Sequence, residues 1–309
     1  MVKVFIDGSA GTTGLRIYER LAKRNDIELI LLSEELRKDT SARKEALNNA
    51  DIAFLCLPDA AAKEAVCFPD NPDTVIIDTS TAHRTAPGWI YGFPELTGQK
   101  EKIATSKRIA NPGCHASGFI SLVAPLVETG IIDKSEKLTC FSLTGYSGGG
   151  KKMIADYETE EEIEALCPPR VYGLSQQHKH LPEMAKLCCL DYAPVFSPIV
   201  SSYYSGMEVV VPLFLSQING DIAKIKSVYK ECYKEGLVYF CEKTDENGFL
   251  SAGKMSGRDD MEISVFGNDE RITLVSRFDN LGKGASGAAI QNMNIVLGVD
   301  ETTGLNIGG

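Results

Sequence analysis

Near its N-terminus the chain reads Asp7-Gly8-Ser9-Ala10-Gly11-Thr12-Thr13-Gly14. An apolar run over residues 2–6 precedes this loop, and a helical repeat of apolar residues through Leu21 follows it. Strand, glycine loop and helix in this order place a pyrophosphate on a helix N-terminus. The spacing G-x-x-G-x-x-G alone also fits a structural turn, but its position predicts a dinucleotide site. The residues expected to contact the cofactor are Gly8, Ser9, Gly11, Thr12, Thr13 and Gly14.

The next expected strand, residues 27–32, indicates which nicotinamide cofactor binds. An NAD site usually has a carboxylate at the end of this strand, where it binds the ribose 2′-hydroxyl. Here Ser33 occupies that position, and Arg37 and Lys38 follow it. This combination suits a 2′-phosphate, so the sequence predicts NADP (NADPH), with Ser33 and Arg37 among its contacts. The alternative is a solvated charged loop.

Further buried strands are expected over residues 51–57 and 74–78, with a helical segment over 60–66 between them. This alternation predicts an α/β domain with a Rossmann-type, doubly wound parallel sheet. Such sheets bind ligands at the C-terminal ends of their strands, where Ser80 and Arg84 follow residues 74–78. Both are candidates for an anionic substrate group, because Arg offers a planar set of donors. The alternative for Arg84 is an ordinary surface position.

A cysteine begins a helix in the stretch Asn111-Pro112-Gly113-Cys114-His115. Pro112 and Gly113 predict a turn, and apolar residues at helical spacing follow as far as Gly130. A helix N-terminus favours the thiolate, which is the form of cysteine that attacks a carbonyl carbon. The alternative is a small buried hydrophobic residue, and the local pattern leaves both open. His115 is less suited as its base, because adjacent helical side chains point about 100° apart.

The second half of the chain predicts a different kind of domain. Longer, partly alternating strands are expected over residues 138–144, 195–204, 207–215, 261–266 and 271–278, and an amphipathic helix over 221–235. Strands without regular helical crossovers predict a second, α+β domain with a largely antiparallel sheet. A flat sheet face of this kind frequently serves as an oligomer interface, so we expect this to be the substrate and dimerisation domain. We expect the NADP-binding domain to cover residues 1–113, completed by a C-terminal helix within 284–309. The catalytic domain would cover 114–283.

Two polar stretches of this half are candidate sites. Residues 145–152 predict a flexible, cationic loop that either binds an anion through backbone N–H groups or simply connects two elements. Residues 176–183 contain His178 and His180. A metal site is one interpretation of this pair, but no third ligand group lies beside it. The other interpretations are an acid/base for Cys114, since His titrates near neutral pH, and two surface histidines.

Composition excludes several classes of protein. The net charge of −10 argues against a nucleic acid or an anionic membrane as the main partner of these 309 residues. No apolar run is long enough to span a bilayer, and Asp7 comes too early for a signal peptide. Nine scattered cysteines without a Cys-x-x-Cys pair predict a reducing, cytoplasmic compartment and no metal site.

Four motifs, in order along nearly the whole chain, resemble the N-acetyl-γ-glutamyl-phosphate reductase family in its shorter (type 2) form. The motif at residues 279–285 is the most specific of the four, and the N-terminal glycine loop is the least specific. Longer members usually carry Asp-Phe-Arg where this chain has Ala82-His83-Arg84. In this stretch, therefore, the family's functional residues correspond only to Ser80 and Arg84. The motifs are the Gly8/Gly11/Gly14 loop, Asn111-Pro112-Gly113-Cys114, His178-Lys179-His180-x-Pro182-Glu183 and Asp279-Asn280-Leu281-x-Lys283-Gly284-Ala285.

The resemblance implies an activity and roles for individual residues. The activity is NADPH-dependent reduction of N-acetyl-L-glutamyl 5-phosphate to the 5-semialdehyde through a thioester on Cys114, in arginine biosynthesis. His178 would be the acid/base, with His180 as the alternate. Ser80, Arg84, Asn111 and Ser147 would contact the substrate, and Asn280 and Lys283 would lie near the nicotinamide half of the cofactor.

The expected partners are a small acyl phosphate and further copies of the chain, in a homodimer or homotetramer. Two other functions stay open. One is aspartate-semialdehyde dehydrogenase or a related acyl-phosphate reductase, and the other is a non-catalytic NADP-binding regulator.

Overall fold

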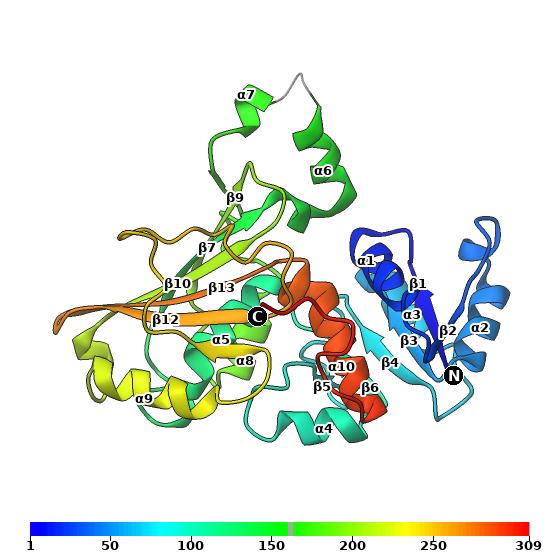
Figure 1. Cartoon of the computed structure of the whole chain (residues 1–309), viewed down its shortest axis with the longest axis horizontal. Coiled ribbons are helices and arrows are strands. Elements are labelled where there is room, and N and C mark those ends of the chain that lie inside the picture. The colour runs from blue at the N-terminus through cyan, green and yellow to red at the C-terminus, as the bar shows by residue number, and fades with distance from the viewer. Residues whose placement is uncertain (160–162, 309) are drawn as a thin grey trace. The chain divides into compact units, whose positions relative to one another are not determined.

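The computed structural model describes residues 1–159 and 163–308. They form two compact units, which are described separately (Figure 1). The first unit consists of residues 1–94, 98–112 and 285–305. The second contains the described residues of 95–97, 113–284 and 306–308. None of the helices built from the described residues is long and apolar enough to cross a membrane.

A six-stranded parallel sheet forms the centre of the first unit, in the order β2-β1-β3-β4-β6-β5. Four of its strands, β1 to β4, form where the apolar runs predict them, whereas the short β5 and β6 are not predicted, and all six pair in parallel register. The sheet therefore confirms the predicted doubly wound class. The strands are β1 (Val2–Asp7), β2 (Ile27–Ile30), β3 (Ile52–Leu55), β4 (Val75–Asp78), β5 (Ile90–Tyr91) and β6 (Arg108–Ala110).

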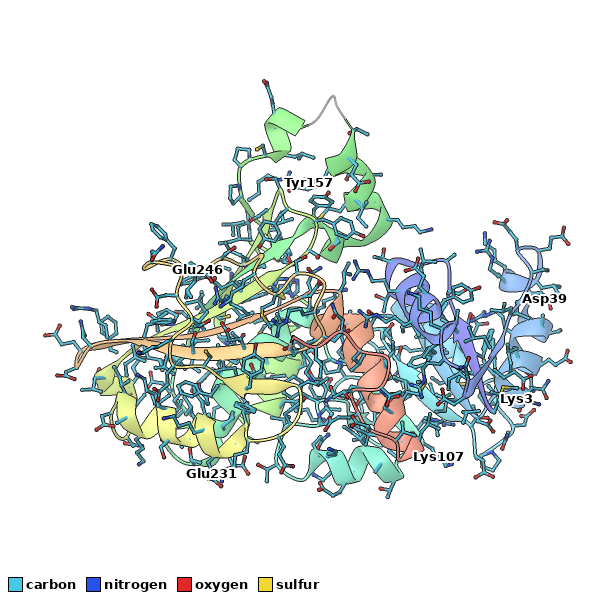
Figure 2. The ribbon with its side chains drawn as sticks, viewed as in Figure 1. Lys3, Asp39, Lys107, Tyr157, Glu231 and Glu246 are labelled. Atoms are coloured by element: carbon cyan, nitrogen blue, oxygen red, sulfur yellow. The ribbon has the colours of Figure 1, made fainter. Side chains whose placement is uncertain are left out.

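Helices cover both faces of this sheet, as two separate apolar clusters show. One cluster joins the sheet to Ile17 of α1 and Ile290 of α10, and the other joins it to Leu47 of α2 and Ala65 of α3. Asp39, which is labelled in Figure 2, caps α2 by accepting the N–H of Ala42 at 2.7 Å. The helices are α1 (Thr12–Leu21), α2 (Thr40–Asn49), α3 (Asp59–Ala65), α4 (Gln99–Thr105) and α10 (Gly287–Leu297).

The second unit is built on a seven-stranded mixed sheet, in the order β11-β12-β13-β10-β7-β9-β8. The pairs β7–β9 and β11–β12 are parallel and the other pairs antiparallel, which confirms the largely antiparallel prediction. The strands are β7 (Thr139–Gly145), β8 (Arg170–Val171), β9 (Val195–Ser201), β10 (Met207–Phe214), β11 (Val238–Phe240), β12 (Met261–Gly267) and β13 (Arg271–Phe278).

One face of this sheet carries α5 (Cys114–Glu128), which packs on β10 and β13 and is flanked by α8 (Leu181–Leu187) and α9 (Ile222–Cys232). Gly118 permits the close approach. A Cβ at this position would lie 2.4 Å from Cγ2 of Val209 and 2.8 Å from Oγ of Ser276. This packing fixes α5, and therefore its first residue, Cys114, against the sheet.

The stretch over residues 145–152 differs from the flexible loop that its glycines predict. Residues Tyr146–Gly149 form a 3₁₀ turn, and α6 (Gly150–Glu158) begins directly after it. Both lysines, Lys151 and Lys152, therefore lie in the first turn of a helix and not in a mobile connection. In Figure 1, α6 and α7 (Ile163–Leu166) extend away from the seven-stranded sheet.

Candidate active site

The glycine loop after β1 has a conformation that only small residues permit. Gly8 has a φ of +88°, and a Cβ at this position would lie 2.3 Å from the carbonyl oxygen of Cys56. A Cβ at Gly14 would lie 2.4 Å from the carbonyl oxygen of Gly8. Gly11 precedes the first helical residue, Thr12, and has no side chain to cap α1. The loop backbone is therefore suited to a phosphate group at the N-terminus of α1.

A cavity of about 690 Å³ opens beside this loop, a volume in the usual range for a small-molecule site. Among its lining residues are Gly8, Ser9 and two predicted basic residues, Arg37 and Lys38. Arg37 lies in the 3₁₀ turn Leu36–Lys38, and its guanidinium forms an ion pair with Glu34. The backbone carbonyl of Ser33 accepts the N–H groups of Leu36 and Arg37, which fixes this turn after β2.

Arg43 is a residue of this cavity that the sequence analysis missed. From α2 its guanidinium binds the carboxylate of Asp7, with Nη2 2.8 Å and Nε 3.0 Å from Oδ2, and both side chains are buried. Burial raises the pKa of Asp7, and Arg43 opposes that effect. The ion pair compensates the charge of Asp7 beside a loop suited to an anion. The short, polar sequence of α2 gave no signal for this contact.

The predicted substrate residues of the first unit gather at the ends of β4 and β6. Arg84 donates from Nε to the carbonyl oxygen of Asn111 at 3.0 Å and from Nη2 to that of Thr79 at 3.2 Å. Ser80 donates its hydroxyl to Asp78 at 2.8 Å, and Asn111 donates its amide to the carbonyl oxygen of Ala285 at 3.0 Å. The structure thus brings Ser80, Arg84 and Asn111 together, and their contact with a substrate stays a prediction.

Cys114 is the first residue of α5 and is half-buried. The backbone of Gly284 lies against it, since a Cβ on Gly284 would be 2.9 Å from Cβ of Cys114. The next residue, His115, is buried, and its ring centroid lies 5.7 Å from that of His178 and 5.5 Å from that of His180. The fold therefore brings both candidate histidines to the N-terminus of α5.

The two histidines have different environments. His180 is buried at the start of α8, where its Nε2 lies 3.9 Å from Oε1 of the buried Glu183. Its backbone N–H donates to Nδ1 of His178 at 3.2 Å, so a neutral His178 carries its hydrogen on Nε2. His178 is only half-buried. His178 is the more exposed of the two, which favours it over His180 as the acid/base, and this role stays a prediction.

The other predicted residues of the second unit bind protein groups. Asn280 donates its amide to Oγ of Ser147 at 3.0 Å and accepts the N–H of Gly206 at 3.0 Å. Lys283 forms an ion pair with Glu95 at 2.7 Å, and both side chains are buried. The roles of Asn280 and Lys283 toward a cofactor, and of Ser147 toward a substrate, stay predictions.

Tyr172 is the second residue that sequence reasoning missed. Its hydroxyl lies 2.6 Å from Nε2 of His115, and its ring meets the ring of His178 at a centroid distance of 5.8 Å. The residue follows the short strand β8 in a stretch without apolar periodicity, so no pattern distinguishes it from the other tyrosines. In the part of the chain that the structure describes, no group of three or more His, Cys, Asp or Glu could hold a metal ion.

Comparisons with known proteins identify the family. Residues 32–106 match a family model described as the semialdehyde dehydrogenase NAD binding domain, and residues 114–280 match the semialdehyde dehydrogenase dimerisation domain. N-acetyl-gamma-glutamyl-phosphate reductase of Brucella suis is 45% identical over 306 residues, which cover 96% of this chain and 99% of the relative. The chain belongs to the N-acetyl-gamma-glutamyl-phosphate reductase family. Reductase 2 of Nostoc sp. is 44% identical over 318 residues, covering 98% of this chain and 99% of that one.

Solved structures share the fold of this reductase family member. Aspartate semialdehyde dehydrogenase II of Vibrio cholerae, complexed with ASA, superposes with a TM-score of 0.73 over 96% of this chain and 98% of that chain, at 15% identity. Aspartate semialdehyde dehydrogenase of Candida albicans with NADP has a TM-score of 0.67 over 96% and 99% of the two chains, at 14% identity. At this identity the likeness concerns the fold alone.

Proposed function

We propose that the protein catalyses NADPH-dependent reduction of N-acetyl-L-glutamyl 5-phosphate to N-acetyl-L-glutamate 5-semialdehyde and phosphate, in arginine biosynthesis. The observation that carries this proposal is the position of Cys114 at the N-terminus of α5, beside His115 and near His178. This arrangement occurs in a chain that is 45% identical, over nearly its full length, to a named reductase. It supplies the nucleophile and the proton carrier that an acyl-phosphate reduction needs.

In the proposed mechanism the Cys114 thiolate attacks the acyl-phosphate carbonyl carbon. A carbon–sulfur bond forms, the carbon–oxygen bond to phosphate breaks, and phosphate leaves with the electron pair, which gives a thioester. A bound nicotinamide cofactor would supply the hydride that reduces the thioester carbonyl. Nε2 of His178 protonates the oxygen that becomes negative. His178 takes the proton back as the carbon–sulfur bond breaks, and the aldehyde leaves with the thiolate regenerated.

The residues present fit NADP(H), because the Gly8–Gly14 backbone suits a pyrophosphate and the cavity beside it carries Arg37 and Lys38. Arg37 and Ser33 would bind the 2′-phosphate. Ser80, Arg84, Asn111 and Ser147 would bind the substrate, and Asn280 and Lys283 would lie near the nicotinamide half.

A homodimer or homotetramer, located in the cytoplasm, is the proposed assembly. The match to a dimerisation domain supports self-association through the second unit. Phe141, Val195 and Phe214 give further support, since strand register places these exposed side chains on one face of the sheet, opposite α5.

Replacing Cys114 by Ser tests the covalent mechanism. We expect Cys114→Ser to lose reductase turnover by at least about 1,000-fold, because the weakly nucleophilic hydroxyl replaces a thiolate. NADPH affinity, measured by fluorescence titration, should stay within about twofold. Undiminished turnover in the variant would show that no thioester on Cys114 is needed. A wild-type protein that binds NADPH without turning over acyl phosphate would favour the non-catalytic regulator.

A further inference from the structure

Arg43 is the third basic residue of the cavity beside the glycine loop. It lies in α2, which follows the turn that carries Arg37 and Lys38, and all three side chains line the cavity. The acidic residues among the lining side chains are Asp7 and Glu34. The wall of the cavity therefore carries more positive than negative charge, which suits an anionic group of a ligand.

The ion pair with Asp7 uses only part of the Arg43 guanidinium. Nε lies 3.2 Å from Oδ1 and 3.0 Å from Oδ2 of Asp7, and Nη2 lies 2.8 Å from Oδ2. Nη1 donates to none of the described residues, yet it is not one of the polar atoms that are buried without a partner. Because Arg43 lines the cavity, the hydrogens on Nη1 are accessible from the cavity.

Two contacts hold this guanidinium in place before any ligand binds. The carboxylate of Asp7 fixes one edge, and the ring of Phe68 packs on the guanidinium, with its centroid 5.2 Å from Cζ. Only 8% of Arg43 is exposed, so the side chain has little conformational freedom to lose. A donor that is already ordered binds a ligand at a lower entropic cost than a mobile surface side chain does.

The position of Arg43 indicates which group of a dinucleotide it meets. In a Rossmann-type sheet the ribose 2′ position lies at the end of the second strand, and the pyrophosphate lies on the backbone of the glycine loop. Arg37, Lys38 and Arg43 all come from the segment directly after β2. Arg37 is half-buried and pairs with the exposed Glu34, and Lys38 is exposed, so Arg43 is the most rigidly held of the three.

We propose that Arg43 binds the 2′-phosphate of NADPH through Nη1, and that Asp7 is the positioning residue that holds the guanidinium for this contact. The proposal rests on the proposed function in one respect, since it assumes that NADPH is the cofactor. A hydrogen bond to an ionised phosphate is about twice as strong as one between neutral groups. NADH carries a hydroxyl in place of this phosphate, so Arg43 contributes to the discrimination between the two cofactors.

The competing explanation is that Arg43 only compensates the charge of Asp7. The single change Arg43→Met does not separate the two roles, because it also leaves the carboxylate of Asp7 buried without its counter-charge. The double variant Asp7→Asn/Arg43→Met does separate them. It removes both charges, so a purely compensating arginine predicts the wild-type affinity for NADPH, and a direct contact predicts a loss.

Fluorescence titration of the full chain with NADPH and with NADH tests the proposal. We expect the Kd of NADPH for Asp7→Asn/Arg43→Met to rise about tenfold or more, the usual effect of losing a hydrogen bond to a charged group. The Kd of NADH should stay within about twofold, because NADH lacks the 2′-phosphate. Retained binding of NADH also shows that the nucleotide site of the variant is folded.

Arg24→Met is the matched control and should keep both Kd values. Arg24 also belongs to the first unit and pairs with an aspartate, Asp26, but it is not one of the residues that line the cavity. The inference alone is wrong if the wild-type protein prefers NADPH and the double variant keeps the wild-type Kd, or if the Kd values of NADPH and NADH rise equally. Wild-type protein that binds NADH as tightly as NADPH would overturn the proposed cofactor and this inference together.

Discussion

At the scale of single residues, position explains why one cysteine of nine is the candidate nucleophile. Burial raises the pKa of Cys56 to about 12, and it raises the pKa values of Cys140 and Cys188 further. These thiols stay protonated near neutral pH. Cys114 instead begins a helix and is half-buried, which combines the favourable end of a helix dipole with access for a substrate.

Replacing each of the two histidines by Asn, in separate variants, distinguishes their roles. We expect His178→Asn to lower kcat by about 10²- to 10⁴-fold with little change in the KM for NADPH, the usual contribution of a general acid. His180→Asn is the control, since His180 is buried beside Glu183, and its exchange should reduce the free energy of unfolding more than kcat. Steady-state kinetics and urea unfolding measure both effects. A larger loss of kcat in His180→Asn than in His178→Asn would identify His180 as the acid/base instead.

The sequence predicts the candidate site residues only where a local pattern marks them. Cys114 follows a turn and precedes a helical repeat, and His178 belongs to a histidine pair, so both are visible as candidates. The sequence does not mark Arg43 or Tyr172 as candidates. Their hydrogen-bond partners, Asp7 and His115, lie 36 and 57 residues away along the chain. No periodicity of the chain encodes such contacts.

At the scale of elements, the glycine loop and the turn after β2 both line the cavity of the first unit. The apolar runs predict β1, β3 and β4 because buried parallel strands are nearly continuous in hydrophobicity. Hydrophobic patterns do not predict the helices α2 and α4, because both are short and mostly polar. They also miss α6, because three consecutive glycines predict a loop where the chain forms a 3₁₀ turn followed by a helix.

The basic residues of the turn after β2 should decide cofactor preference. Arg37→Ala is expected to raise the KM for NADPH about tenfold or more and to leave that for NADH nearly unchanged, because only the former carries a 2′-phosphate. Steady-state kinetics with both cofactors measure the ratio. Arg271→Ala is the control, since this exposed arginine pairs with Glu270 in the second unit. Equal effects on NADPH and NADH would mean that Arg37 does not contact the 2′-phosphate.

At the scale of the whole molecule, the chain passes between the two units several times. Glu95 belongs to the second unit, although the residues on both sides of 95–97 belong to the first. Its carboxylate forms an ion pair with the ammonium of Lys283, 188 positions along the sequence, and both side chains are buried. A contact between residues so distant in sequence could not be predicted, because its partners are adjacent only after the unit has folded.

Removing one member of the Lys283–Glu95 pair should lower the stability of the protein. Lys283→Met is expected to reduce the free energy of unfolding by about 3–5 kcal/mol, because the carboxylate of Glu95 stays buried without the counter-charge. Lys234→Met is the control, since Lys234 pairs with Glu231, labelled on α9 in Figure 2, and both are exposed. Lys234→Met should reduce the free energy of unfolding by at most about 1 kcal/mol. Urea unfolding compares the two variants, and equal stability would contradict a structural role for the Lys283–Glu95 pair.

The most direct test of the proposed activity runs the reaction in reverse. The purified protein is given NADP⁺, inorganic phosphate and either N-acetyl-L-glutamate 5-semialdehyde or aspartate semialdehyde, with Cys114→Ser as the blank, and formation of NADPH is followed by absorbance. We predict phosphate-dependent oxidation of N-acetyl-L-glutamate 5-semialdehyde with a kcat/KM more than about 100-fold above that for aspartate semialdehyde. Faster oxidation of aspartate semialdehyde, or oxidation that needs no phosphate, would contradict the proposed function.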